Sequence, residues 1–182
     1  PDADFALLAA RLASGYAFAG DLERASERGE LALDIAESLG LPEPLTRAFL
    51  AKSLVAEARG HPQEAVAFLA QALAIAIAHD LPEQASTIYH NLSVSSYVRD
   101  RYNDALGYLQ PALELSRRLG SRPLEWSLLA ESTYPLYMSG RWEEALAALE
   151  ELTEEQIRSG AMFLSLLASV LEIHIHRGQL EQ

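Results

Sequence analysis

Cysteine is absent from this chain of 182 residues, and lysine occurs only once, as Lys52. Without cysteine the chain has no disulfide framework, no thiolate metal site and no cysteine nucleophile. No apolar run reaches the roughly 18 residues that a membrane-spanning helix needs. The N-terminal residues 1–4 also lack the basic region of a signal peptide. We therefore expect a cytoplasmic protein with no membrane segment.

Positive charge is scarce as well. The chain has 14 basic and 26 acidic residues, which gives a formal net charge of −12. A field of this sign repels the phosphate backbone of nucleic acids, so we expect no direct nucleic-acid binding. Hydrophobic residues make up 49% of the chain, with alanine and leucine abundant. This composition is typical of a helical globular protein, and the length fits one domain over residues 1–182.

The sequence repeats itself with a period of 40 residues. Four similar turn segments begin at Gly20, Gly60, Asp100 and Gly140. In each segment the turn residue is followed two positions later by an apolar residue and five positions later by an alanine. Four copies in register indicate a helical repeat protein. The apolar residues after each turn lie on one face of a helix, and small side chains there allow neighbouring helices to approach closely.

Each repeat is predicted to contain two helices joined by a short turn. Apolar residues at helical spacing predict first helices over 4–19, 44–59, 84–99 and 124–139. Second helices begin near 21, 62, 103 and 142, and glycine or proline ends them. The predicted repeats are 4–40, 44–80, 84–120, 124–160 and a partial fifth, 162–182. We expect the chain to be a fragment of a longer solenoid, because a predicted helix over 162–177 carries an apolar stripe with no second helix to cover it.

No constellation of residues points to catalysis or to a cofactor. The five histidines form no helical pair four residues apart, and His174 and His176 point to nearly opposite sides of a helix. The adjacent glutamates, such as Glu143 and Glu144, are typical of solvated helix surfaces. Nucleotide-binding loops and hydrolase motifs are absent from the sequence. We expect no enzyme activity, no metal site and no cofactor.

The turn segments and the residues after them resemble the tetratricopeptide repeat (TPR) superfamily. The third repeat shows this best, in Asp100, Tyr102, Ala105, Leu109 and Ala112. The resemblance implies an all-α fold, a right-handed superhelix of antiparallel helix pairs. The long period resembles the repeat regions of bacterial regulators such as the maltose-regulon activator, LuxR-type ATPases and class III cyclases.

The sequence departs from the family pattern at two positions, and one other family shares its period. Lys52 stands where the TPR pattern usually has leucine, and Gly29 stands where it usually has a large residue. HEAT repeats have a similar period and are the structural alternative, but they do not usually show this turn segment. We therefore keep the TPR fold as the prediction.

The resemblance also implies a concave groove lined by the first helix of every repeat. The positions that we expect to form its binding surface are Arg47, Leu54, Glu57, His90, Val94, Tyr97, Tyr134, Tyr137 and Met138. The same register places Leu50 and Thr87 in the groove. The tyrosines could serve as anchors for a partner, or they could pack on neighbouring helices. A carboxylate clamp is not expected, because Arg47 is the only arginine or lysine among these positions.

Three functions fit these observations. The first is a non-catalytic scaffold that binds a peptide or protein segment in the groove, as a regulatory module of a larger bacterial signalling or transcription protein. The second is self-association, with a homodimer formed through the uncovered C-terminal helix. The third is a sensor in which a small ligand enters the groove and controls an attached effector domain.

Overall fold

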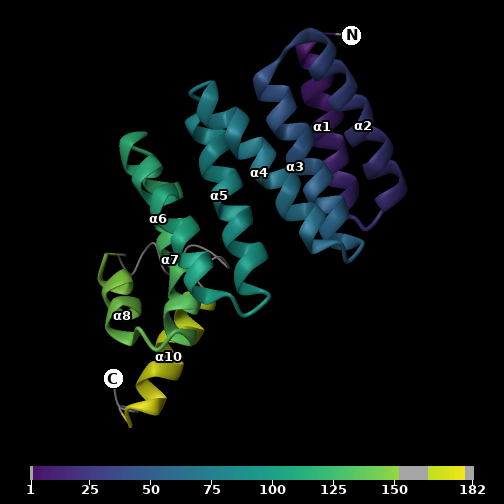
Figure 1. Cartoon of the computed structure of the whole chain (residues 1–182). Coiled ribbons are helices and arrows are strands. Elements are labelled where there is room, and N and C mark those ends of the chain that lie inside the picture. Colours follow the sequence, from purple (N-terminus) through teal and green to yellow (C-terminus); the bar gives the residue numbers. More distant parts are fainter. Residues whose placement is uncertain (1, 152–163, 179–182) are drawn as a thin grey trace. The chain divides into compact units, whose positions relative to one another are not determined.

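The computed structural model describes residues 2–151 and 164–178, and in these ranges the regular elements are all α-helices. In chain order they are α1 (Ala3–Phe18), α2 (Leu22–Leu39), α3 (Pro42–Ala58), α4 (Pro62–Ala78), α5 (Pro82–Tyr97), α6 (Tyr102–Arg118), α7 (Arg122–Met138), α8 (Trp142–Glu150) and α10 (Leu164–His176). From α1 to α8, Figure 1 shows consecutive helices joined by short turns. The prediction of an all-α helical repeat fold is confirmed.

The helices form two compact units, and the boundary falls inside α5. Unit 1 covers Pro1–Leu92 and unit 2 covers Ser93–Gln182. In unit 1, α1 packs against α2 and α3, and α3 packs against α4. In unit 2, α7 packs against α6, α8 and α10. In each unit, elements adjacent in sequence pack against one another, as expected for a repeat protein.

The turns recur every 20 residues, which is half of the period seen in the sequence. The backbone takes a left-handed conformation, with positive φ, at positions 20, 40, 60, 80, 100, 120 and 140. At each turn the next amide donates to a carbonyl five residues earlier, from Asp21 N to Tyr16 O through to Arg141 N to Leu136 O. This is the Schellman motif that ends many helices, and glycine suits its left-handed position. Asp80 and Asp100 also occupy this left-handed position, with φ of 51° and 60°, although their side chains make the conformation less favourable than it is for glycine.

Proline explains why some helices begin earlier than predicted. Helices α3 and α5 begin at Pro42 and Pro82, two residues before the predicted starts at 44 and 84. The first position of a helix suits proline, because its φ is already helical and its missing N–H would have no partner within the helix. Helix α4 begins at Pro62, as predicted.

Unit 1 is packed mainly through alanine. One cluster of fully buried side chains consists of Ala9, Ala10, Ala32 and Ala48, which belong to α1, α2 and α3. Such small side chains let helix backbones approach closely and leave little room for a larger residue.

The two departures from the family pattern lie together in unit 1. A Cβ atom placed on Gly29 of α2 would lie 3.6 Å from Cγ of Lys52 of α3. An alanine would fit here, but the large side chain that is usual at this position would meet the stem of Lys52. The Lys52 ammonium pairs with Glu30 and lies 5.1 Å from the centre of the Phe68 ring. The unusual lysine is thus accommodated by the unusual glycine.

Among its described residues, unit 2 contains larger buried side chains and a buried carboxylate. Leu109, Leu128 and Ile173 are fully buried. The side chain of Glu125 on α7 is only 5% exposed, and it accepts from Arg117 of α6 (2.7 Å) and from Arg122 (2.9 Å). The hydrogen bond from Arg117 outweighs the effect of burial and, with Arg122, lowers the pKa of the Glu125 carboxyl.

The predicted C-terminal helix is present over Leu164–His176, and its apolar stripe is partly exposed. Val170 and Ile173 of α10 are buried, whereas Leu167, Leu171 and Ile175 are exposed, Leu171 by 60%. Met162 and Phe163, which the prediction included in this stripe, lie outside the described residues, as do positions 152–160 of the predicted fourth repeat.

Candidate functional site

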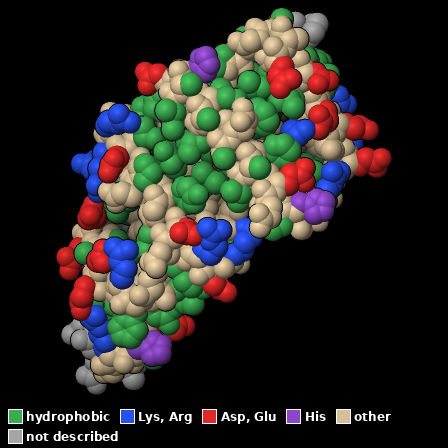
Figure 2. All heavy atoms as spheres, in the orientation of Figure 1, with side chains coloured by type: hydrophobic (Ala, Val, Ile, Leu, Met, Phe, Trp, Pro, Cys, Tyr) green, Lys and Arg blue, Asp and Glu red, His purple; other side chains and the backbone are tan. Residues whose placement is uncertain are grey.

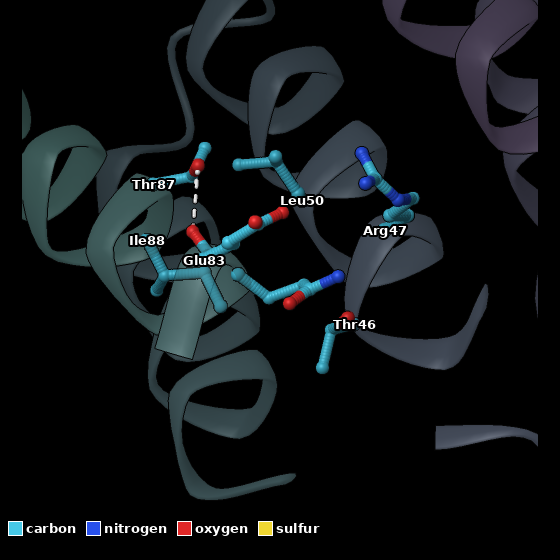
Figure 3. Close-up of a pocket in the computed structure, with 7 residues that line it drawn as sticks. Thr46, Arg47, Leu50, Glu83, Thr87 and Ile88 are labelled. Atoms are coloured by element: carbon cyan, nitrogen blue, oxygen red, sulfur yellow. Dashed lines mark hydrogen bonds between the residues drawn. The ribbon is translucent and has the colours of Figure 1, made fainter. Parts of the chain in front are cut away.

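A hollow of about 100 Å³ lies between α3 and α5 in unit 1. Three of its seven lining residues are positions that the family register places in the groove. These are Arg47, Leu50 and Thr87. Figure 3 shows Arg47 and Leu50 on one wall, which is α3, and Thr87 on the opposite wall, which is α5. The remaining lining residues are Thr46, Glu83, Gln84 and Ile88.

Some polar groups of the hollow have hydrogen-bond partners within the protein and others have none. The hydroxyls of Thr46 and Thr87 donate to helix carbonyls, at 2.7 and 3.0 Å. The guanidinium of Arg47 donates to the Glu43 carboxylate over 3.3 Å. Within the part of the chain that the structure describes, the side chains of Glu83 and Gln84 have no hydrogen-bond or ion-pair partner. Both are therefore available to a ligand, and Glu83 extends from α5 toward α3 (Figure 3).

The other groove positions predicted in unit 1 have intermediate or high exposure. Leu54 and His90 are half-buried and Glu57 is exposed. Leu54 and Glu57 lie on α3, and His90 lies on α5. These three residues do not line the hollow, so the structure groups only some of the predicted positions around one cavity.

In unit 2 the structure brings two predicted tyrosines together. The rings of Tyr97 and Tyr134 meet edge to face, with centres 5.9 Å apart. Tyr102, which the prediction did not include, meets Tyr134 in the same way at 6.1 Å. Tyr134 remains 37% exposed. Burial, followed by the nearby Glu131 carboxylate, raises the pKa of the Tyr97 phenol.

Tyr137 belongs to a different cluster. Its ring stacks with Trp142 of α8 and His176 of α10, with centres 6.4 Å away in each case. Its hydroxyl donates to Glu172 of α10 at 3.0 Å, which raises the pKa of the phenol. The tyrosines were expected either to anchor a partner or to pack on neighbouring helices. Tyr137 packs on neighbouring helices.

The last two predicted positions in unit 2 are Val94 and Met138. Val94 is half-buried on α5, and Met138 is 44% exposed at the end of α7. Together with Tyr134, Met138 gives α7 an exposed, mainly apolar surface.

The structure adds binding features that sequence reasoning missed. A second hollow, lined from α2, α3 and α4, includes Lys52, Glu30, Arg59 and Phe68. The departures at Lys52 and Gly29 were the available sequence signal for it. Glu83 and Gln84 gave no such signal, because charged and amide residues are ordinary in the first turn of a helix.

The described residues show neither a metal-binding cluster nor a helix that could span a membrane. Residues 2–151 and 164–178 hold no group of three or more histidine, aspartate or glutamate side chains that could bind a metal ion. None of the described helices combines the length and the apolar character needed to cross a membrane.

Comparison with known proteins adds one family match and several solved structures. Residues 86–119 match the family model described as a tetratricopeptide repeat. No curated protein matches the sequence.

Three solved structures share the fold. BtubC (BKLC) from P. vanneervenii is 23% identical with a TM-score of 0.73, and the match covers 93% of this chain and 72% of that one. A protein from Podosopora anserina with nearly identical TPR-like repeats is 19% identical with a TM-score of 0.74, covering 95% and 87%. A Rap protein complexed with Competence and Sporulation Factor is 17% identical with a TM-score of 0.73, covering 96% of this chain and 54% of that one.

These matches agree with the helix order, the turns and the packing described above. The family match lies on the third repeat, whose residues gave the clearest likeness in the sequence. The fold likeness extends over more than nine-tenths of the chain. Together they confirm the resemblance to the tetratricopeptide repeat superfamily.

Proposed function

We propose that the chain is a non-catalytic scaffold that binds a peptide or protein segment along the first helices of its repeats. The observation that carries the proposal is the hollow between α3 and α5, because it occurs at groove positions that the family register specifies. TPR-like repeats generally mediate contacts between proteins. A helical repeat surface suits this role, since it offers an extended area made from many short modules.

Two further observations support the proposal. Tyr134 and Met138 expose apolar area on α7, and Leu50 and Ile88 provide apolar contacts within the hollow of unit 1. The Rap protein, which shares the fold, was solved in complex with Competence and Sporulation Factor. We extend the proposal to a regulatory module of a larger bacterial signalling or transcription protein, located in the cytoplasm.

The proposal is tested by blocking the hollow. Thr87 is exposed on α5, so Thr87→Arg fills the hollow without disturbing the core. Affinity enrichment from a lysate of the source cells compares this variant with the wild-type chain. We expect a bound protein that the variant loses, followed by at least about tenfold weaker binding of the purified partner segment.

A matched control separates the hollow from a general effect of charge. Gln71→Arg adds the same charge at an exposed position of α4, outside the hollow. We expect this control to retain the partner. Equal retention by all three baits would overturn the groove as the binding site.

Self-association is a second candidate function, because α1 and α10 each carry exposed apolar side chains. These are Phe5, Leu8 and Leu12 on α1, and Leu167, Leu171 and Ile175 on α10. Light scattering of the wild-type chain and of Leu171→Glu tests the C-terminal face. A wild-type dimer that becomes a monomer in the variant would support a homodimer, and a wild-type monomer at all concentrations would reject it.

A further inference from the structure

We propose that the hollow between α3 and α5 selects a neutral carboxamide, the side chain of an asparagine or glutamine in the partner. The inference rests on the proposed function and adds the chemistry of one anchor. It follows from the charges on the two walls and from the polar groups that lack partners.

The two walls carry opposite charges. Arg47 lies on the α3 wall and Glu83 on the α5 wall, and the structure shows no ion pair between them. A carboxylate in the hollow would satisfy Arg47 but face Glu83. An ammonium or guanidinium would satisfy Glu83 but face Arg47. A charge of either sign therefore meets a like charge on one wall, which disfavours it.

A carboxamide avoids this conflict because it carries both an acceptor and a donor. Its oxygen can accept from Arg47, and its N–H groups can donate to the Glu83 carboxylate. The amide of Gln84, half-buried and without a partner, can supply one more donor and one more acceptor. The methylene stem of the ligand can pack on Leu50 and Ile88, which also line the hollow.

The surroundings support a neutral group over an acidic one. Unit 1 has more acidic than basic residues, and acidic side chains lie on the face of α1 and α2 drawn in Figure 2. The positive charge of Arg47 is also partly neutralised by the Glu43 carboxylate, whose oxygen lies 3.3 Å from the guanidinium. The hollow, with a volume of about 100 Å³, has room for one side-chain group of this kind.

The test uses a phage-displayed library of random 12-residue peptides, selected on the whole chain. We expect enriched peptides that share an asparagine or glutamine at one position. Replacing that residue with leucine should weaken the synthetic peptide by about tenfold or more, because the polar groups of the hollow would lose their partner. Replacing it with glutamate or lysine should weaken binding at least as much.

Two variants change the charge of one wall each and should change the selected residue. In Glu83→Lys both walls are basic, so we expect the shared position to become aspartate or glutamate. In Arg47→Glu both walls are acidic, so we expect lysine or arginine. Gln71→Arg serves as the control and should select the same carboxamide as the wild-type chain.

The outcomes distinguish this inference from the proposed function. Enriched peptides that lose binding in Thr87→Arg, but share no carboxamide and do not respond to the wall variants, would overturn the inference and leave the groove as the binding site. Failure to enrich any peptide that depends on Thr87 would overturn both. Circular dichroism of each variant confirms that the helices are retained.

Discussion

The two units share one 20-residue framework but fill it differently. Among the described residues, alanine supplies fourteen of the nineteen buried hydrophobic residues before position 93, and five of thirteen after it. Unit 1 is therefore held by close approach of helices, and unit 2 by larger side chains and by a buried carboxylate that pairs with two more exposed arginines. A regular turn spacing thus fixes where helices begin and end, while the packing between them remains free to vary.

The largest expected effects come from opposite changes of size in the two cores. In unit 2, Leu128→Ala should reduce the free energy of unfolding by about 2–4 kcal/mol, because it leaves a cavity at a fully buried position. In unit 1, Ala48→Leu should cost about 1–3 kcal/mol, because it adds volume at a fully buried position packed against other alanines. Urea denaturation measures both changes. A tolerated Ala48→Leu would contradict the close packing of unit 1.

The buried carboxylate of unit 2 should make its stability depend on pH. Glu125→Gln should cost about 1–2 kcal/mol at pH 7, since two charge-assisted hydrogen bonds are weakened. The pKa of Glu125 is lowered in the folded protein. Its contribution is therefore present above the pKa of an unfolded glutamate, and is lost as the pH falls through the lowered value.

Thermal unfolding between pH 7 and pH 3 checks the Glu125 prediction. We expect the difference between the wild-type chain and Glu125→Gln to shrink as the pH falls over the acidic end of this range. A difference that stays constant down to pH 3 would show that Glu125 acts through packing and not through its charge.

The smallest expected effects are at the left-handed turn positions, which both units share. Asp80→Gly should raise the free energy of unfolding by up to about 1 kcal/mol, because glycine takes a left-handed conformation without the strain of a side chain. Asp100→Gly should gain less, since Asp100 also accepts a hydrogen bond from the Tyr102 hydroxyl at 2.5 Å. Chemical denaturation measures both gains.

A control for these turn substitutions lies within α2. Asp34 is exposed in the helix interior, so Asp34→Gly should destabilise the protein by roughly 0.5–1 kcal/mol. The same chemical change should therefore have opposite signs at positions 34 and 80. A loss of stability in Asp80→Gly would contradict the role assigned to the turns.

The sequence predicted the helices well because their ends are decided locally. Glycine or aspartate at the turn and proline at the first helical position act over a few residues. The position of the turns at Gly20 and Gly60 follows directly from this. The starts of α3 and α5 were placed two residues late, although Pro42 and Pro82 carried the necessary signal.

The candidate site could be predicted only in part, because it depends on contacts between distant residues. The register placed Arg47 and Thr87 on facing helices, but not the unpartnered amide of Gln84 between them. The role of Tyr137 required the position of α10, where the turn at Gly178 comes 38 residues after Gly140 and interrupts the regular period. His176 of α10 stacks on Tyr137, and a contact between residues so far apart in the sequence leaves no local signal.

Site-specific photocrosslinking shows whether partners bind the face formed by the first helices of the repeats. Benzoylphenylalanine is placed either at Thr87, beside the hollow, or at Gln71, on the exposed side of α4. We expect the partner recovered by affinity enrichment to crosslink from position 87 and not from position 71. A crosslink from position 71 with none from position 87 would contradict binding at this face.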